Sequence, residues 1–210
     1  MYHHFRKWSR DGSLKRFWAH SIDMIRDQLD TTHLNLDGSH TLAKKGGEAV
    51  SYQRFKRAKT SNILPITDRN GFVIASTNII AGHHNDAWEL STHLKHAFRS
   101  LHRLSIAISG AFFNADAAFD MRAARKVCFN YRLIPNIAPN SRGRRRAKPG
   151  PARRFDAAVY KHRFCAERTF AWIDKFRALL VRYDRCASHF MGAHFIAFAL
   201  INLRVIFNPD

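Results

Sequence analysis

The 210-residue sequence has few cysteines and no long apolar segment. Cys128, Cys165 and Cys186 are odd in number and show no C-x-x-C spacing, which argues against a disulfide framework and a cysteine zinc site. The N-terminus lacks a stretch resembling a signal peptide. The most apolar run, Phe195–Ile201, is far shorter than the ~20 residues that span a bilayer. We therefore expect reduced thiols, a cytoplasmic location and no membrane association.

Acidic residues are also scarce. Asp and Glu total 16 against 35 Lys and Arg, which gives a formal net charge of +19. Such an excess repels itself in a folded domain unless a polyanion neutralises it, so nucleic acid is the first candidate partner and an anionic membrane the second. Hydrophobic residues make up 46% of the chain, which excludes a disordered polypeptide. A cationic RNA-binding protein would share the charge, but it would leave the carboxylates described below unexplained.

Periodicity predicts an α/β fold of RNase H type, with a mixed five-stranded sheet flanked by helices. We expect the fourth strand to lie beside the first. Residues 1–30 look helical, and Asn70-Gly71 indicates a hairpin between the second and third strands. The five predicted strands are a segment ending near Asp37, Asn62–Thr67, Phe72–Ile80, Gly110–Asn114 and Leu133–Ile137.

Four further helices are predicted. Leu90, Leu94, Phe98 and Leu101 recur at helical spacing, after a cap at Asn85 or Asp86. The other three are a helix capped by Asp120 and ending at Phe129, a long helix over residues 157–183, and an apolar helix over residues 188–204.

Three carboxylates occupy positions that such a sheet would bring together. Asp37 follows the first strand, Asp116 follows the fourth, and Glu167 lies on the long helix. Two Mg²⁺ ions held by carboxylates activate the nucleophile and stabilise the leaving oxygen in phosphoryl transfer. Periodicity alone does not single out these three residues among 16 acids.

Two basic segments and one helix face suggest contacts with DNA. Tyr160, Arg163 and Glu167 share a helix face, where Arg163 could bind a phosphate, although a surface ion pair is the ordinary alternative. Residues 141–154 contain no acid, and residues 44–59 contain one. We expect both segments to contact the phosphate backbone, although charge runs are often simply solvated. The residues concerned are Lys44, Lys45, Arg142, Arg144, Arg145, Arg146 and Lys148.

Four stretches of the sequence resemble the DDE transposases of bacterial insertion sequences, specifically insertion-sequence family five. They are LDGSHTLAKKGGEAV (36–50), TDRNGFVIASTNIIAGHHND (67–86), NADAAFD (114–120) and YKHRFCAERTFAWIDKFRALLVRY (160–183). The resemblance implies that Asp37, Asp116 and Glu167 are catalytic metal ligands for two Mg²⁺ ions, with Mn²⁺ as a substitute. It also implies cleavage and strand transfer of double-stranded DNA by a homodimer associated with the nucleoid.

The sequence departs from the family pattern in three places. The motif places a basic residue seven positions beyond the Glu, where this chain has Asp174, so Lys175 is the alternative DNA contact. Ala117 and Ala118 stand where a Gly is common. Members usually carry a longer N-terminal DNA-binding region, so we expect residues 1–30 to be its helical remnant and residues 31–210 to be the catalytic domain. The chain would then be N-terminally truncated or the product of a downstream frame, acting with an upstream-frame polypeptide; the alternative is a non-catalytic, DNA-binding inhibitor or an inactive remnant.

Overall fold

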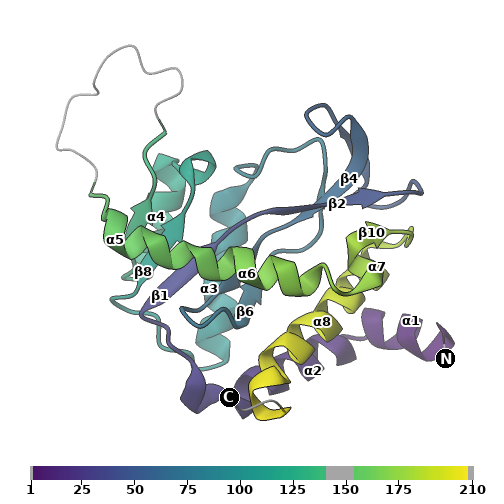
Figure 1. Ribbon diagram of the computed structural model, residues 1–210, viewed down its shortest axis with the longest axis horizontal. Coiled ribbons are helices and arrows are strands. Elements are labelled where there is room, and N and C mark those ends of the chain that lie inside the picture. The colour runs from purple at the N-terminus through teal and green to yellow at the C-terminus, as the bar shows by residue number, and fades with distance from the viewer. Residues whose placement is uncertain (1, 141–153, 208–210) are drawn as a thin grey trace.

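The computed structural model describes residues 2–140 and 154–207, in which helices surround two β-sheets (Figure 1). The main sheet has the strand order β6-β5-β1-β8-β9. Its strands are β1 (His33–Leu36), β5 (Pro65–Thr67), β6 (Val73–Ser76), β8 (Phe112–Ala115) and β9 (Ile134–Ile137). β1 is antiparallel to β5 and parallel to β8, and β8 is parallel to β9. Each of the five predicted strands overlaps one of these, and β8 lies beside β1 as expected. Two of the predicted bounds are wrong: Asn62 and Ile63 belong to a strand of the second sheet, and the strand predicted over Phe72–Ile80 ends at Ser76.

The main sheet is the centre of the core. All four residues of β1 are buried, as expected for a strand covered on both faces. In Figure 1, α5 (Ala157–Tyr160) and α6 (Phe164–Ile173) cross in front of β8 and β1, while α3 (Leu90–Arg103) lies behind them. The four apolar residues that predicted α3 are all buried, and α4 (Arg122–Asn130) packs beside this helix. The helical periodicity therefore identified the correct buried face.

The two predicted helix caps are wrong. α3 begins after Glu89, whose side chain makes no capping hydrogen bond, and Asp86 instead binds His40 and Asn62. α4 begins after Met121, whereas Asp120 forms an ion pair with Arg125 at 2.9 Å. Each carboxylate accepts charged or amide donors from elsewhere in the fold, and charge-assisted hydrogen bonds are stronger than neutral ones.

A second sheet was not predicted. It has the order β10-β2-β4-β3, and β7 pairs with β4. Its strands are β2 (Ser39–Ala43), β3 (Ser51–Gln53), β4 (Ala58–Ile63), β7 (Ile80–Ala81) and β10 (Val181–Arg182). The segment over residues 44–59, expected to be a loop, therefore contains β3 and the start of β4. The many charged residues of this segment favoured the prediction of a loop, although strands with one exposed face also carry charged residues.

The predicted long helix over residues 157–183 is interrupted. It consists of α5 (Ala157–Tyr160), η3 (Lys161–Arg163), α6 (Phe164–Ile173) and α7 (Arg177–Leu180), followed by β10. β10 pairs with β2, and the buried Arg182 guanidinium donates hydrogen bonds to the Glu48 carbonyl and the Ser61 hydroxyl. These tertiary contacts draw the chain out of the helical conformation that local propensity favours.

The C-terminal helix α8 (Ala187–Phe207) packs against α1 (Tyr2–Arg10), α2 (Ser13–Met24) and α6. η1 (Arg26–Gln28) follows α2. α8 has 21 residues and is apolar enough to cross a membrane by length and composition, which the short run identified in the sequence did not indicate. However, 56% of its most apolar window is buried inside the protein. Asn202 binds both backbone groups of Val73, and the Trp18 indole also donates to the Val73 carbonyl, so α2 and α8 belong to the core.

Candidate active site

Two adjacent strands place Asp37 and Asp116 at one edge of the main sheet. β1 ends at Leu36 and β8 at Ala115, and each acid is the next residue. Asn35 of β1 is in register with Asn114 of β8. Because the strands are parallel and each acid lies two residues beyond its paired asparagine, both acids leave the sheet at the same edge.

The third acid comes from α6, which packs against β1 and β5 of the main sheet. Cys165 donates to the Arg69 carbonyl at 2.9 Å, and Thr169 donates to the Gly71 carbonyl at 2.8 Å. These bonds anchor the buried side of α6 to the turn between β5 and β6. Glu167 lies on the outward side, where its side chain is 66% exposed. The charges of Asp116 and Glu167 both act on Asp37, so the three predicted acids lie in one region.

Arg163 links these elements. Its Nη1 donates to Asp37 Oδ2 at 2.8 Å, and its Nη2 lies 3.8 Å from Glu167 Oε1. Its Nε donates to the Tyr160 hydroxyl at 3.2 Å. Tyr160 and Arg163, expected to contact DNA, therefore contact each other, and the guanidinium group lies beside the predicted catalytic residues.

The electrostatics show how closely the acids approach. Burial raises the pKa of Asp37, the charge of Arg163 and the backbone N–H of Gly38 lower it, and the charges of Asp116 and Glu167 raise it further. Burial alone would lower the pKa of Arg163, but Asp37, Tyr160 and Asp116 raise it. Each of the three carboxylates therefore lies within electrostatic range of at least one other, and Arg163 is their shared counter-charge.

Three buried asparagines connect the strands beneath these acids. Asn114 Nδ2 donates to Asn35 Oδ1 at 2.9 Å, and Asn136 Nδ2 donates to Asn114 Oδ1 at 2.8 Å. Asn136 also exchanges hydrogen bonds with the backbone of Asp156, whose side chain caps α5. This asparagine ladder joins β1, β8 and β9 to the start of the helical segment carrying Arg163. Sequence reasoning missed it, although Asn35 and Asn114 each precede a predicted catalytic Asp by two residues.

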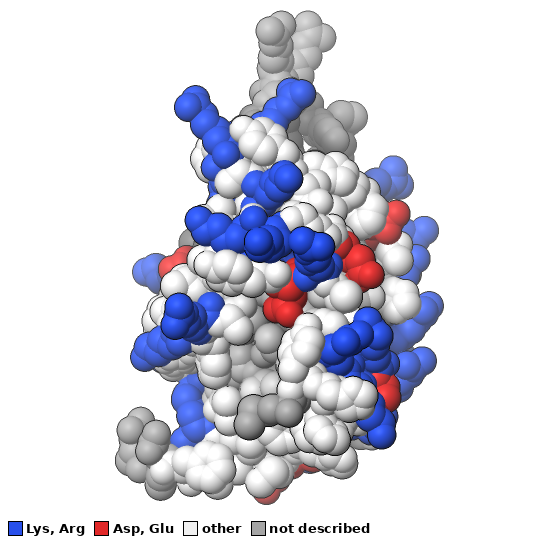
Figure 2. Space-filling view, turned by 90° about the vertical axis from the view of Figure 1, so that its right-hand side faces the viewer, with Lys and Arg blue, Asp and Glu red and all other residues white. Residues whose placement is uncertain are grey.

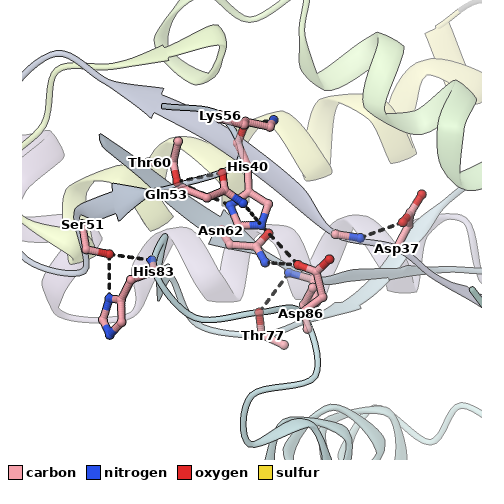
Figure 3. Close-up of polar contacts among 12 residues, drawn as sticks. Asp37, His40, Ser51, Gln53, Lys56, Thr60, Asn62, Thr77, His83 and Asp86 are labelled. Atoms are coloured by element: carbon pink, nitrogen blue, oxygen red, sulfur yellow. Dashed lines mark hydrogen bonds and ion pairs between the residues drawn. The ribbon is translucent and has the colours of Figure 1, made fainter. Parts of the chain in front are cut away.

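A second polar cluster adjoins Asp37 through the start of β2. Asp86 Oδ1 accepts hydrogen bonds from Asn62 Nδ2 at 2.6 Å and His40 Nε2 at 3.2 Å. The hydrogen bond from His40 is the main reason that the pKa of Asp86 is lowered. Figure 3 shows His40, Asn62 and Asp86 grouped together, with Asp37 beside them. A Cβ at Gly38 would lie only 3.0 Å from Asp86 Oδ1, so any larger residue here would press on the Asp86 side chain.

The predicted DNA contacts are less closely grouped. Lys44 and Lys45 are exposed in the segment between β2 and β3, and Lys175 is exposed just after α6. Arg142, Arg144, Arg145, Arg146 and Lys148 lie outside the described residues.

Comparison with known proteins gives the class of this fold. A cryo-EM structure of the piggyBac transposase synaptic complex with hairpin DNA matches 84% of this chain and 47% of its own chain, with 12% identity and a TM-score of 0.55. The chain thus spans about half the length of that transposase. The Mos1 transposase paired-end complex with left transposon end matches 90% of this chain and 62% of its own, with 14% identity and a TM-score of 0.39. No curated protein matches significantly. The fold is RNase H-like.

The sequence family is more specific. Residues 29–202 match the model of the DDE superfamily endonucleases. The match covers most of the chain, which therefore belongs to the DDE superfamily endonucleases. This result confirms the predicted transposase-like class.

Members of this superfamily generally use divalent metal ions. The donor set fits such ions, because carboxylate oxygens are the ligands that Mg²⁺ prefers. The Arg163 guanidinium already places a positive charge between Asp37 and Glu167. Within residues 2–140 and 154–207, no three His, Cys, Asp or Glu side chains are grouped closely enough to hold one ion. In this arrangement the Arg163 guanidinium is the partner of Asp37 Oδ2.

Proposed function

We propose that this protein is a transposase of insertion-sequence family five that cleaves DNA strands and transfers the new 3′ ends to target DNA. The main support is the position of Asp37, Asp116 and Glu167 around the Arg163 guanidinium, in a chain of the DDE endonuclease superfamily. Without a cation nearby, the negative charges of three carboxylates this close repel one another. Their cationic partner indicates a site built to hold positive charge.

In this proposal Asp37, Asp116 and Glu167 bind the metal ions. Two Mg²⁺ ions, or Mn²⁺ in their place, supply activation of the attacking oxygen and stabilisation of the leaving oxygen. Asp37 and Asp116 are set by the register of β1 and β8, whereas Glu167 is exposed and free to adjust. Arg163, once released from Asp37, binds a DNA phosphate through its planar group of donors, and Tyr160 orients it.

The proposed partner is double-stranded DNA. Figure 2 shows many more Lys and Arg than Asp and Glu side chains on the face that it presents. Exposed Lys44, Lys45 and Lys175 are proposed to contact phosphates, as are the basic residues of the 141–154 segment. Phosphate contacts position DNA without reading its sequence. Recognition of particular element ends, homodimer formation and cooperation with an upstream-frame polypeptide are proposed from the family resemblance.

The decisive experiment is cleavage of a labelled duplex in Mg²⁺ or Mn²⁺ by the wild-type chain and by Asp37→Asn, Asp116→Asn and Glu167→Gln. We expect each substitution to abolish cleavage while leaving duplex binding within a few-fold of wild type. Asp27→Asn is the control, because Asp27 is an exposed acid of η1 and lies outside the proposed site. Full cleavage by any of the three variants would refute the assignment of that residue.

The second candidate function is DNA binding without catalysis, as an inhibitor of an intact transposase or as an inactive remnant. The observation that favours it is the absence, within the described residues, of three grouped metal ligands while Arg163 holds Asp37. Duplex binding by wild type with no cleavage in either metal, and no metal-induced stabilisation, would support this function over the first.

A further inference from the structure

The turn between β3 and β4 carries an unusual side chain. Phe55 is 92% exposed, more than any other large hydrophobic residue in the described part of the chain. The turn closes with a hydrogen bond from the Arg57 N–H to the Arg54 carbonyl, and Arg57 has a φ of 49°. Small polar residues are usual in such turns. Because its ring buries almost no apolar area, Phe55 contributes little to folding.

The surroundings of Phe55 are cationic. Arg54, Lys56, Arg57 and Lys59 are all exposed, and the sequence has no acid from residue 49 to residue 67. Tyr52, in β3, is 54% exposed and so adds a second aromatic ring to this hairpin. Exposed aromatic rings among Lys and Arg side chains match the chemistry of nucleic-acid bases and phosphates. A protein partner with an apolar pocket would not need the surrounding positive charge.

The hairpin is firmly joined to the candidate active site. β4 pairs with β2 from Leu42↔Thr60 to Ser39↔Ile63, and β2 begins two residues after Asp37. Lys56 Nζ donates to the His40 carbonyl at 3.3 Å, which ties the turn to the same strand. The six residues of β4, from Ala58 to Ile63, are separated by five steps and span about 17 Å at ~3.4 Å per step. The ring of Phe55 is therefore held roughly 20 Å from Asp37.

We propose that Phe55 stacks on an unstacked or unpaired base of the DNA, and that the flanking cations bind the adjacent phosphates. This inference rests on the proposed function, because it takes DNA as the substrate. At ~3.4 Å per base pair, 20 Å corresponds to at most about six base pairs. The contacted base thus lies within about six base pairs of the phosphate at Asp37. In this proposal the basic 44–59 segment contacts a DNA base through Phe55 as well as the DNA phosphates through its Lys and Arg side chains.

The test measures binding of the whole chain to a fluorescent duplex, intact or with one unpaired base, as salt is varied. We expect Phe55→Ala to weaken binding to the unpaired-base duplex by roughly 5- to 150-fold, which is the effect of one stacked base. The salt slope should not change, because no cation is removed. Phe55→Trp should retain binding.

Lys56→Gln should instead flatten the log–log slope of binding against salt by about one unit. Phe129→Ala is the matched control, since Phe129 is an exposed phenylalanine on α4.

A second measurement locates the contact. 2-Aminopurine placed at successive positions of a duplex should show a fluorescence change that depends on Phe55 and falls within about six base pairs of the cleavage site. If the wild-type chain and Phe55→Ala bind the unpaired-base duplex equally well, this inference is overturned and the proposed function is left intact. Failure of the wild-type chain to bind any duplex would overturn the proposed function itself. A Phe55→Ala variant that loses self-association but not DNA binding would also overturn the stacking role.

Discussion

Arg163 Nη1 donates a hydrogen bond of 2.8 Å to Asp37 Oδ2, joining the helical segment to the end of β1. Asp37 Oδ1 accepts from the Gly38 N–H, so both carboxylate oxygens are engaged. The side chains of Arg163 and Asp37 are only 16% and 20% exposed, so this is not an ordinary surface ion pair. A group that neutralises Asp37 in the folded chain also competes with any metal for that carboxylate.

We predict that Arg163→Gln destabilises the metal-free protein by about 1–3 kcal/mol, because it leaves a partly buried carboxylate unpaired. Mg²⁺ or Mn²⁺ should then stabilise Arg163→Gln more than wild type, because the competing cation is gone. Urea unfolding with and without each metal measures both effects. Arg177→Gln, which removes an exposed arginine of α7, is the control. Equal metal responses of wild type and Arg163→Gln would contradict the competition between Arg163 and metal.

Whereas removal of Arg163 should increase the stabilisation by metal ions, removal of the Asp37 charge should decrease it. We predict that millimolar Mg²⁺ or Mn²⁺ raises the midpoint of thermal unfolding of the wild-type chain, because a ligand bound only by the folded state stabilises it. Asp37→Asn should reduce that increase, since it removes a ligand charge while preserving side-chain shape. Thermal melts over a range of metal concentrations provide the measurement, with Asp27→Asn as control. A wild-type chain that shows no metal response would count against a metal site at Asp37.

The main sheet was predictable because its strands are apolar and bounded by turn residues. Asn70-Gly71 correctly identified the hairpin between β5 and β6, where Gly71 has a φ of 87°. The second sheet was not predictable in the same way. β3 and β10 have three and two residues, and their positions depend on pairing with β4 and β2 rather than on local pattern.

The candidate site shows the same division. The sequence predicted that Asp37 and Asp116 would leave adjacent strands, which the parallel pairing of β1 and β8 confirms. It did not predict that Arg163 would contact Asp37, because 126 residues separate them. The sequence predicted a helix cap at Asn85 or Asp86, because the partners of Asp86 in the fold, His40 and Asn62, lie 46 and 24 residues away. Long-range polar contacts of this kind depend on tertiary structure, which periodicity does not encode.

The asparagine ladder leads to a prediction about alignment. Asn114→Ala removes both the donor to Asn35 Oδ1 and the acceptor for Asn136 Nδ2, so each of these buried amides loses one hydrogen bond while keeping its bonds to the backbone. We expect a loss of about 2–4 kcal/mol in unfolding free energy, at ~1–3 kcal/mol per unsatisfied group. We also expect a weaker metal-induced stabilisation than in wild type, because Asp37 and Asp116 lose the contact that aligns them. Asn78→Ala, at an exposed asparagine, should cost less than about 0.5 kcal/mol. If folded Asn114→Ala protein is stabilised by metal as much as wild type is, the asparagine ladder contributes to stability but does not align Asp37 and Asp116.

The stability of the protein should depend on pH through a buried histidine. His194 lies on α8 with 1% exposure, and its Nδ1 is 2.9 Å from the Phe190 carbonyl. Burial lowers its pKa from 6.5 to about 4; the Phe190 carbonyl opposes this shift and the charge of Arg182 adds to it. Below pH 6.5 the unfolded chain binds a proton that the folded chain does not, so stability falls as the pH drops from 6.5 to about 4. A shift of this size corresponds to roughly 3 kcal/mol. Below about pH 4 both states are protonated and this loss ends. His194→Leu should therefore lose less stability than wild type between pH 7 and pH 4.5, as measured by urea unfolding at each pH. Parallel pH profiles for the two proteins would show that His194 is protonated equally in the folded and unfolded states.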